Sequence, residues 1–345
     1  MTAPAALRQA LGFAIALHMS SACGDPGEKA DTREAEVRGG LECQPGSMIA
    51  DDPASPSPGA ADPRPRGLGY ADDPKPLPAH VAYLTFDDGP SEWTPAILDT
   101  LQQQSILATF FITSRQLKRP AGLHTSFIDA QGQPRSLQEV LATVVAQGHA
   151  IGNHTADHFD LATLDSAAAA CEFDANERAI NDALGEEGVA PRPLTLLRPP
   201  FGSPWRPQRP LADPAAEQAR IGALLAPRGV NVLWTVDSTD SREWAQGESF
   251  SSTAAPIPPP AADAPSHDDK VARIVTSVLQ DPQIARGDGA IIIMHDTHST
   301  TRDALPALID GLRAAGYTFG SVEDLVVSRW QATSGELYTR PALRD

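Results

Sequence analysis

The sequence predicts an α/β protein whose parallel strands are covered by helices on both faces. Strand-like and helix-like segments alternate at least six times along the chain. The strand-like segments are apolar throughout, as strands are when both of their faces are buried. A barrel and an open doubly wound sheet both fit this pattern. In either architecture, functional sites form at the carboxyl ends of the strands.

The individual elements follow from local pattern. Short runs rich in apolar residues predict strands at 81–87, 108–113, 149–154, 195–200, 231–237 and 289–296. Helical periodicity predicts helices at 94–104, 136–148, 165–185, 215–229, 268–280 and 303–316. Gly148 ends the second of these helices, and Asp165 or Ser166 caps the start of the third.

Composition limits the function classes. The chain has 345 residues, of which 41% are hydrophobic, enough for one large domain or two ordinary ones. It carries 44 acidic and 27 basic residues, a net charge of -17, which argues against nucleic acid or an anionic membrane surface as the main ligand. Three cysteines cannot form a disulfide scaffold. Cys43 and Cys171 could pair in an oxidising compartment, and the sequence leaves this open.

The first 23 residues have the pattern of an export signal. Arg8 precedes a short apolar stretch at 11–17, too short to span a bilayer, and small residues lead to Cys23. The segment resembles a bacterial lipoprotein signal, although Ser20 stands where Leu is usual. We expect an exported protein that meets the membrane only through a lipid on Cys23. The alternative is an ordinary secretory signal and a secreted protein.

The rest of the chain divides into segments that differ in composition and periodicity. Residues 24–76 are rich in proline and acidic residues and show no periodicity, so we expect a disordered linker. The folded domain is expected at 77–330, with a tail at 331–345. Within the domain, 114–135 and the proline-rich 245–267 are expected to be insertions that border the cleft.

Polar residues occupy the ends of the predicted strands, where a site would form. They are Asp87, Asp88, His154, Arg198, Asp237, His295 and Asp296. His154 and His158 are four residues apart, so a helical turn would put both imidazoles on one face, as a divalent metal requires. Arg198 is expected to pair with a carboxylate, and His295 to exchange protons. Each residue alone also has a simpler explanation. Asp87 and Asp88 could form a solvated acidic turn, and the spacing of His154 and His158 could be chance. Arg198 could be exposed beside a loop, and His295 could be a core histidine with a satisfied hydrogen bond.

Together these residues resemble the polysaccharide deacetylases, the NodB-like domain of carbohydrate esterase family 4, over roughly 78–330. Five motifs carry the resemblance. TFDDGP (85–90), HTADH (154–158) and RPPFG (198–202) are similar to the first three motifs of the family. WTVDSTD (234–240) and IIIMHD (291–296) resemble the fourth and fifth. The resemblance implies an irregular (β/α) barrel, commonly with seven strands.

The resemblance also implies roles for single residues. Asp87 would be the general base, oriented by Arg198, and His295 the general acid, with Asp240 setting its protonation. Asp88, His154 and His158 would hold one divalent metal, usually zinc. The backbone N–H of Phe201 would help to bind the oxyanion. Ser241 stands where the family usually has Trp, and Trp244 is expected to fill that pocket instead.

The expected function is therefore metal-dependent removal of N-acetyl groups from a polysaccharide that contains N-acetylglucosamine, such as peptidoglycan or a chitin-like chain. One alternative keeps the fold but changes the substrate, to a small non-glycan amide or an O-acetyl ester. Another is an inactive glycan-binding protein, against which the retention of Asp87 and His295 argues.

Overall fold

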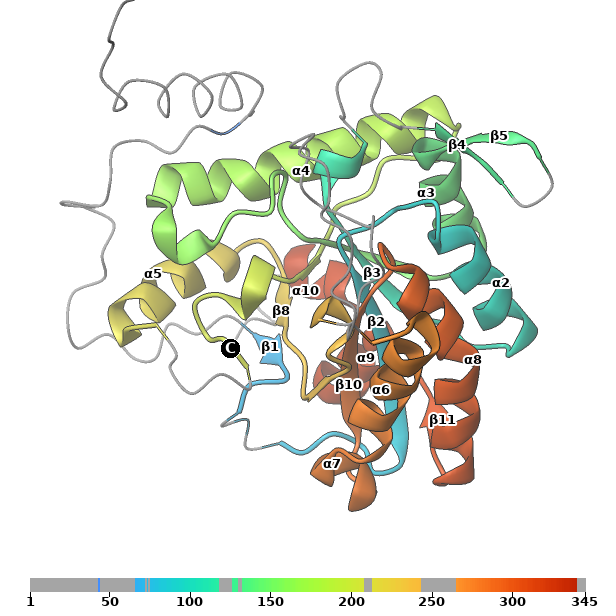
Figure 1. Cartoon of the computed structure of the whole chain (residues 1–345). Helices are drawn as coiled ribbons and strands as arrows, with labels where there is room; N and C mark the ends of the chain where they lie inside the picture. Colours follow the sequence, from blue (N-terminus) through green and yellow to red (C-terminus); the bar gives the residue numbers. More distant parts are fainter. Residues whose placement is uncertain are drawn as a thin grey trace, which may run out of the picture. The chain divides into compact units, whose positions relative to one another are not determined.

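The computed structural model describes residues 43, 66–71, 73, 75–117, 126–129, 132–207, 213–242 and 265–339 (Figure 1). The expected signal at 1–23 with Cys23, most of the expected linker, and Trp244 lie outside the described residues. Within the described part of the chain, no helix combines the length and apolarity that crossing a membrane would require.

A nine-stranded parallel sheet forms the centre of the fold. Its strand order is β1-β8-β7-β6-β3-β2-β10-β9, with β11 paired to β2. The fold class is confirmed, with nine strands in the sheet instead of the seven expected. The strands are β1 Gly67–Leu68, β2 Val81–Asp87, β3 Thr109–Ile112, β6 Ala150–Asn153, β7 Leu196–Leu197, β8 Val230–Val232, β9 Val236–Asp237, β10 Ala290–His295 and β11 Thr318–Phe319.

Helices surround this sheet (Figure 1). They are α2 Thr94–Gln103, α3 Leu137–Ala146, α4 Ser166–Glu186, α5 Ala215–Leu225, α6 His267–Leu279, α7 Pro282–Ala285, α8 Ser299–Ala314, α9 Val322–Trp330 and α10 Ser334–Thr339. On β2, Leu84 and Phe86 pack in the cluster that contains side chains of α2, α3 and α8, while Tyr83 packs in a second cluster with α9. Both faces of β2 are thus buried, which explains why its sequence is apolar throughout.

The predicted single strand at 231–237 is wrong, because this segment belongs to two separate strands. β8 pairs with β7 and β1, whereas β9 pairs with β10 at the other end of the strand order. Between them, the N–H of Leu233 donates to Leu68 at 2.8 Å and the N–H of Thr235 donates to Ile291 at 2.9 Å. Only Leu233, Trp234 and Thr235 separate β8 from β9, so strands near the two ends of the order lie close together and the sheet is curled like a barrel. An apolar sequence run cannot reveal that its ladder partner changes midway.

Residues on both sides of the expected domain, 77–330, take part in the fold. β1 pairs with β8, and Leu68 is fully buried, so the fold includes residues of the expected linker. Cys43, in the same segment, is buried in a disulfide with Cys171 of α4. At the other end α10 lies in the expected tail and buries Leu337. A strand of two residues is too short to show an alternation, so the sequence pattern missed β1.

Smaller corrections concern the insertions and the fourth predicted strand. The first expected insertion, 114–135, contains regular structure: residues 114–116 form a short 3-10 helix. β4 Ser126–Ile128 pairs with β5 Pro134–Ser136 as a hairpin, which extends one residue beyond the insertion. The proline-rich insertion ends before Ser266, which caps α6 with its side chain. The strand expected at 195–200 is only Leu196–Leu197, because Pro199 and Pro200 cannot donate to a ladder.

We predict that Leu68→Ala lowers the free energy of unfolding by about 2–5 kcal/mol, the usual cost of emptying a buried leucine site. The reason is that Leu68 is fully buried in the cluster formed with Val232 and Ile291. Urea unfolding measures this change, and Leu107→Ala, a substitution at a 47% exposed leucine, is the control. A Leu68 variant as stable as the wild type would restore the linker interpretation.

Candidate active site

The ends of β2, β6, β7 and β10 meet at one edge of the sheet, as parallel strands with polar ends should. A cleft of about 770 Å³ opens there. The residues that line it include five of the predicted site residues on or beside these strand ends, Asp87, Asp88, His154, His158 and His295. Phe201, Trp234, Asp237 and Thr239 also line it. The structure therefore brings together residues that lie more than 200 positions apart in the sequence.

Asp88, His154 and His158 form a compact group. Asp88 Oδ1 lies 3.2 Å from His154 Nε2 and 3.1 Å from His158 Nε2, and one ligand atom from each residue lies within 4.8 Å of the others. The segment between the two histidines does not form the helical turn that would also have put them on one face. Thr155 and His158 adopt left-handed backbone conformations with φ of 69° and 61°, so a loop brings the imidazoles together.

This group fits a cation. The Nδ1 of His154 lies 2.6 Å from the carbonyl oxygen of Arg198, which can only accept, so Nδ1 carries the proton. That proton leaves Nε2, which faces Asp88 at 3.2 Å, as the nitrogen that would bind a cation. Asp88 Oδ1 is buried and makes no hydrogen bond. Burial alone would raise the pKa of Asp88, but His158 and His154 hold it well below its usual range, so the carboxylate stays charged. One carboxylate and two imidazoles form an open zinc-type donor set.

Asp87 faces the same cleft but has a different partner. Arg198 Nη1 donates to Asp87 Oδ1 at 2.7 Å, while Asp87 Oδ2 lies 3.7 Å from His154 Nε2. Arg198 is fully buried, and its Nε also donates to the carbonyl of Val232 at 2.8 Å. The expectation that Arg198 pairs with a carboxylate is borne out by this contact, and the arginine fixes the direction of the Asp87 side chain.

His295 and Asp240 form the second polar pair. His295 Nδ1 lies 2.8 Å from Asp240 Oδ1, and the backbone N–H of His295 donates to Asp240 Oδ2 at 2.7 Å. Burial alone would lower the pKa of His295, but Asp240, Asp88 and Asp87 raise it to about 10. Burial alone would raise the pKa of Asp240, but His295 lowers it to about 2. The imidazole is therefore protonated, and its Nε2 lies 3.9 Å from Asp88 Oδ2.

Phe201 and Ser241, which the family resemblance singled out, both line the cleft. Phe201 lies in the short helix Pro200–Gly202 with a positive φ of 58°, and its ring packs edge-on against His158 at 4.8 Å. Its side chain is 43% exposed and borders the cleft. Ser241 also lines the cleft, where the family resemblance led us to expect a tryptophan.

Comparison with known proteins places the chain in a family. Residues 75–215 match the family described as polysaccharide deacetylase. A chitooligosaccharide deacetylase of Bradyrhizobium sp. is 31% identical over 250 residues, which cover 68% of this chain and 85% of that protein. The chain belongs to the polysaccharide deacetylase family.

Other relatives agree with this assignment. A peptidoglycan-N-acetylglucosamine deacetylase of Listeria monocytogenes is 28% identical over 249 residues, which cover 72% of this chain and 39% of that enzyme. Among solved structures, the chitin deacetylase of the fungal pathogen Colletotrichum lindemuthianum has a TM-score of 0.51 at 22% identity. The match covers 72% of this chain and 88% of that structure, and it supports the fold. The family members named here are hydrolases of carbon–nitrogen bonds.

Sequence reasoning did not name Thr301, and it named Asp296 without a role, although both lie beside this polysaccharide deacetylase site. Thr301 on α8 donates to Asp240 Oδ2 at 2.7 Å. Asp296 accepts a hydrogen bond from Thr94 at 2.5 Å, and it lies so close to Gly89 that an added Cβ would be 2.1 Å from its Oδ2. Gly89 is thus required by close approach. The strand-end position of Asp296 was the available signal, but its partner on α2 is visible only in the fold.

We predict that Asp240→Asn lowers the pKa of His295 from about 10 toward its ordinary value of 6.5, because the amide removes the facing charge. A raised pKa in the folded state means that the ion pair stabilises the fold fully below pH 6.5 and less as pH rises toward 10. NMR titration of the metal-free protein and urea unfolding between these pH values test both effects. An unchanged His295 titration in the variant would contradict the pairing.

Proposed function

We propose that this chain is a metal-dependent N-deacetylase that acts on a glycan containing N-acetylglucosamine. The observation that carries the proposal is the convergence of Asp88, His154 and His158 beside the Asp87–Arg198 pair and the His295–Asp240 pair in one cleft. Amide hydrolysis needs an activated water, a stabilised oxyanion and a protonated leaving amine, and this cleft offers a group for each. The acetylated glycans named for the relatives support the substrate class.

Asp88, His154 and His158 are the residues that would hold the metal, for which zinc is the best match to the donor set. When bound, the metal supplies Lewis acidity, which lowers the pKa of a water molecule and favours negative charge on oxygen. Asp87, held by Arg198, takes the proton from the attacking water. The backbone N–H of Phe201 binds the developing oxyanion.

His295 completes the reaction as the acid. Its Nδ1 is held by Asp240, so the proton on Nε2 is the one that faces the cleft. It transfers that proton to the departing sugar amine as the carbon–nitrogen bond breaks, and acetate and the free amine result. Because Asp87 must be ionised while His295 is protonated, activity rises and then falls with pH.

Two other functions remain as outcomes of the test. A small-amide hydrolase or an O-acetyl esterase would use the same groups on a different substrate, and a glycan-binding protein would use none of them for catalysis. We also propose that the protein is exported, with lipidation at Cys23 as the form of attachment. The Cys43–Cys171 disulfide supports export, because such bonds persist in oxidising compartments.

The decisive experiment measures acetate release from N-acetylglucosamine oligosaccharides, peptidoglycan and small amides, with and without a chelator. We predict release from the glycans that the chelator abolishes and added zinc restores. Asp87→Asn should lose at least about a hundredfold in kcat while it keeps its zinc, because Asp87 acts as base and not as ligand. Asp88→Asn is the matched control, with the neighbouring carboxylate neutralised, and should lose the zinc itself. Release that survives the chelator, or the reverse pattern of zinc loss, would refute these roles.

A further inference from the structure

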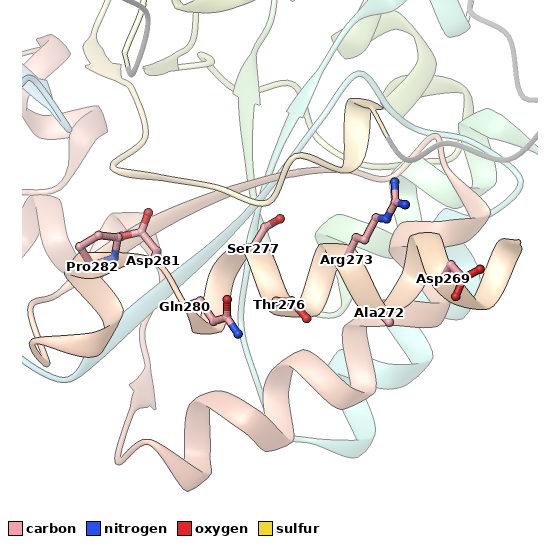
Figure 2. A pocket seen from close by; sticks show the side chains of 8 residues that line it. All are labelled: Asp269, Ala272, Arg273, Thr276, Ser277, Gln280, Asp281 and Pro282. Carbon is pink, nitrogen blue, oxygen red and sulfur yellow. The ribbon is translucent and has the colours of Figure 1, made fainter. Parts of the chain in front are cut away.

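A polar groove lies along one side of α6, next to the cleft. It has a volume of about 680 Å³, and eight residues line it (Figure 2): Asp269, Ala272, Arg273, Thr276, Ser277, Gln280, Asp281 and Pro282. Ser277 and Asp281 line both the groove and the cleft, so the two spaces adjoin at these residues. Ser277 Oγ also lies 2.9 Å from Thr239 Oγ1, which ties α6 to the wall of the cleft.

The spacing of these side chains is regular. Positions 269, 273, 276 and 280 recur three or four residues apart, so hydrogen-bonding groups repeat once per helical turn of about 5.4 Å. This repeat is close to the length of one sugar unit in a β-1,4-linked glycan. The groups themselves are hydroxyl, amide, carboxylate and guanidinium, which all bond to sugar hydroxyls and acetamido groups. Thr276 and Gln280 are exposed in the groove.

We propose that this α6 groove binds the part of the glycan chain beyond the sugar that is deacetylated. The inference rests on the proposed deacetylase function and adds a preference for longer chains. A glycan that occupies the cleft and the groove together gains contacts that a disaccharide in the cleft alone cannot make.

The test compares a disaccharide with a hexasaccharide of N-acetylglucosamine. Thr276→Ala combined with Gln280→Ala should lower kcat/KM for the hexasaccharide about tenfold, from two lost hydrogen bonds, and leave the disaccharide nearly unchanged. Asp268→Ala, at an exposed position on α6 outside the groove, is the control. An equal effect on both substrates, or none, would overturn the proposal.

Binding titrations with the two oligosaccharides test the groove independently of the deacetylase proposal. The wild-type protein should bind the hexasaccharide more tightly than the disaccharide whether or not acetate is released, and the double variant should lose that difference. Equal affinity of the wild type for both lengths would refute the groove as a binding site. Absence of acetate release would refute the proposed function instead.

A second inference concerns Glu172, a buried carboxylate of α4 that lies behind the metal-binding loop 154–158. Its Oε2 accepts the backbone N–H of Asp157 at 2.9 Å, and its backbone carbonyl accepts the N–H of Ala156 at 3.0 Å. The side chain of Glu172 is fully buried. Both contacts fall between His154 and His158.

This loop needs external support. Thr155 and His158 are held in left-handed backbone conformations, which are unfavourable for residues other than glycine and persist only where neighbouring structure enforces them. The Cys43–Cys171 disulfide adds a second contact from the same helix, because it packs with Ala156 of the loop. Cys171 and Glu172 are adjacent, so one turn of α4 contacts the loop through both.

We propose that Glu172 is a positioning residue that holds the loop so that His154 and His158 keep the spacing a metal needs. Groups behind metal ligands commonly change metal affinity by 10- to 100-fold. Glu172→Ala should therefore weaken zinc binding, measured by competition with a chromophoric chelator, by at least about tenfold. Glu172→Gln, whose amide oxygen can still accept from Asp157, should retain most of the affinity.

Two controls separate positioning from general stability. Ile180→Ala, at a buried site on the same helix but in another cluster, should lower the melting temperature and leave zinc affinity within about twofold. If Glu172→Ala fails to fold, Glu172→Asp takes its place, because it withdraws the carboxylate from the Asp157 amide by one methylene. This variant should show the same loss of zinc affinity. Hydrogen exchange at the Asp157 amide of the metal-free protein should speed up in the Ala and Asp variants alone. Unchanged zinc affinity in these variants, or an equal loss in Ile180→Ala, would overturn the proposal.

Discussion

The geometry of the cleft depends on one buried ion pair, between Arg198 at the end of β7 and Asp87 at the end of β2. The guanidinium is fully buried and donates to Asp87, Thr85 and the carbonyl of Val232. The Cζ of Arg198 lies over the ring of Phe111 on β3, 4.0 Å from the ring centroid. A single side chain thus joins β2, β3, β7 and β8 at the edge where the site forms. Removing one partner of such a pair commonly costs about 3–5 kcal/mol, because the other charge stays buried.

The same residue also acts on the metal group through its main chain. The carbonyl of Arg198 accepts the Nδ1 proton of His154, which leaves Nε2 directed at Asp88. The position of β7 therefore sets both the direction of Asp87 and the tautomer of His154. The groups proposed as base and as metal ligand are in this way fixed by one residue, although they lie on different strands.

A second buried pair, His295 with Asp240, lies next to these carboxylates. Asp240 is fully buried and accepts from the backbone of His295, from its ring and from Thr301. This places a cationic imidazole beside the carboxylates, because β10 pairs with β2 with His295 in register with Asp87, and His295 Nε2 lies 3.9 Å from Asp88 Oδ2. The cleft thus holds carboxylates and a cationic imidazole side by side, the two kinds of group that the proposed hydrolysis of an amide uses.

The sequence by itself determined the fold class and the identity of the polar groups, because apolar strands with polar ends are a local pattern. It also predicted the pairing of Arg198 with a carboxylate, since a buried arginine needs one. Tertiary structure alone decided the partners: that β8 pairs with β1 and β7 while β9 pairs with β10, that Leu68 and Leu337 belong to the core, and that Cys43 reaches Cys171. It also decided that a left-handed loop supported by Glu172, and not a helical turn, brings His154 and His158 together. These features arise from contacts between segments far apart in the chain, and such contacts leave no periodic trace in either segment.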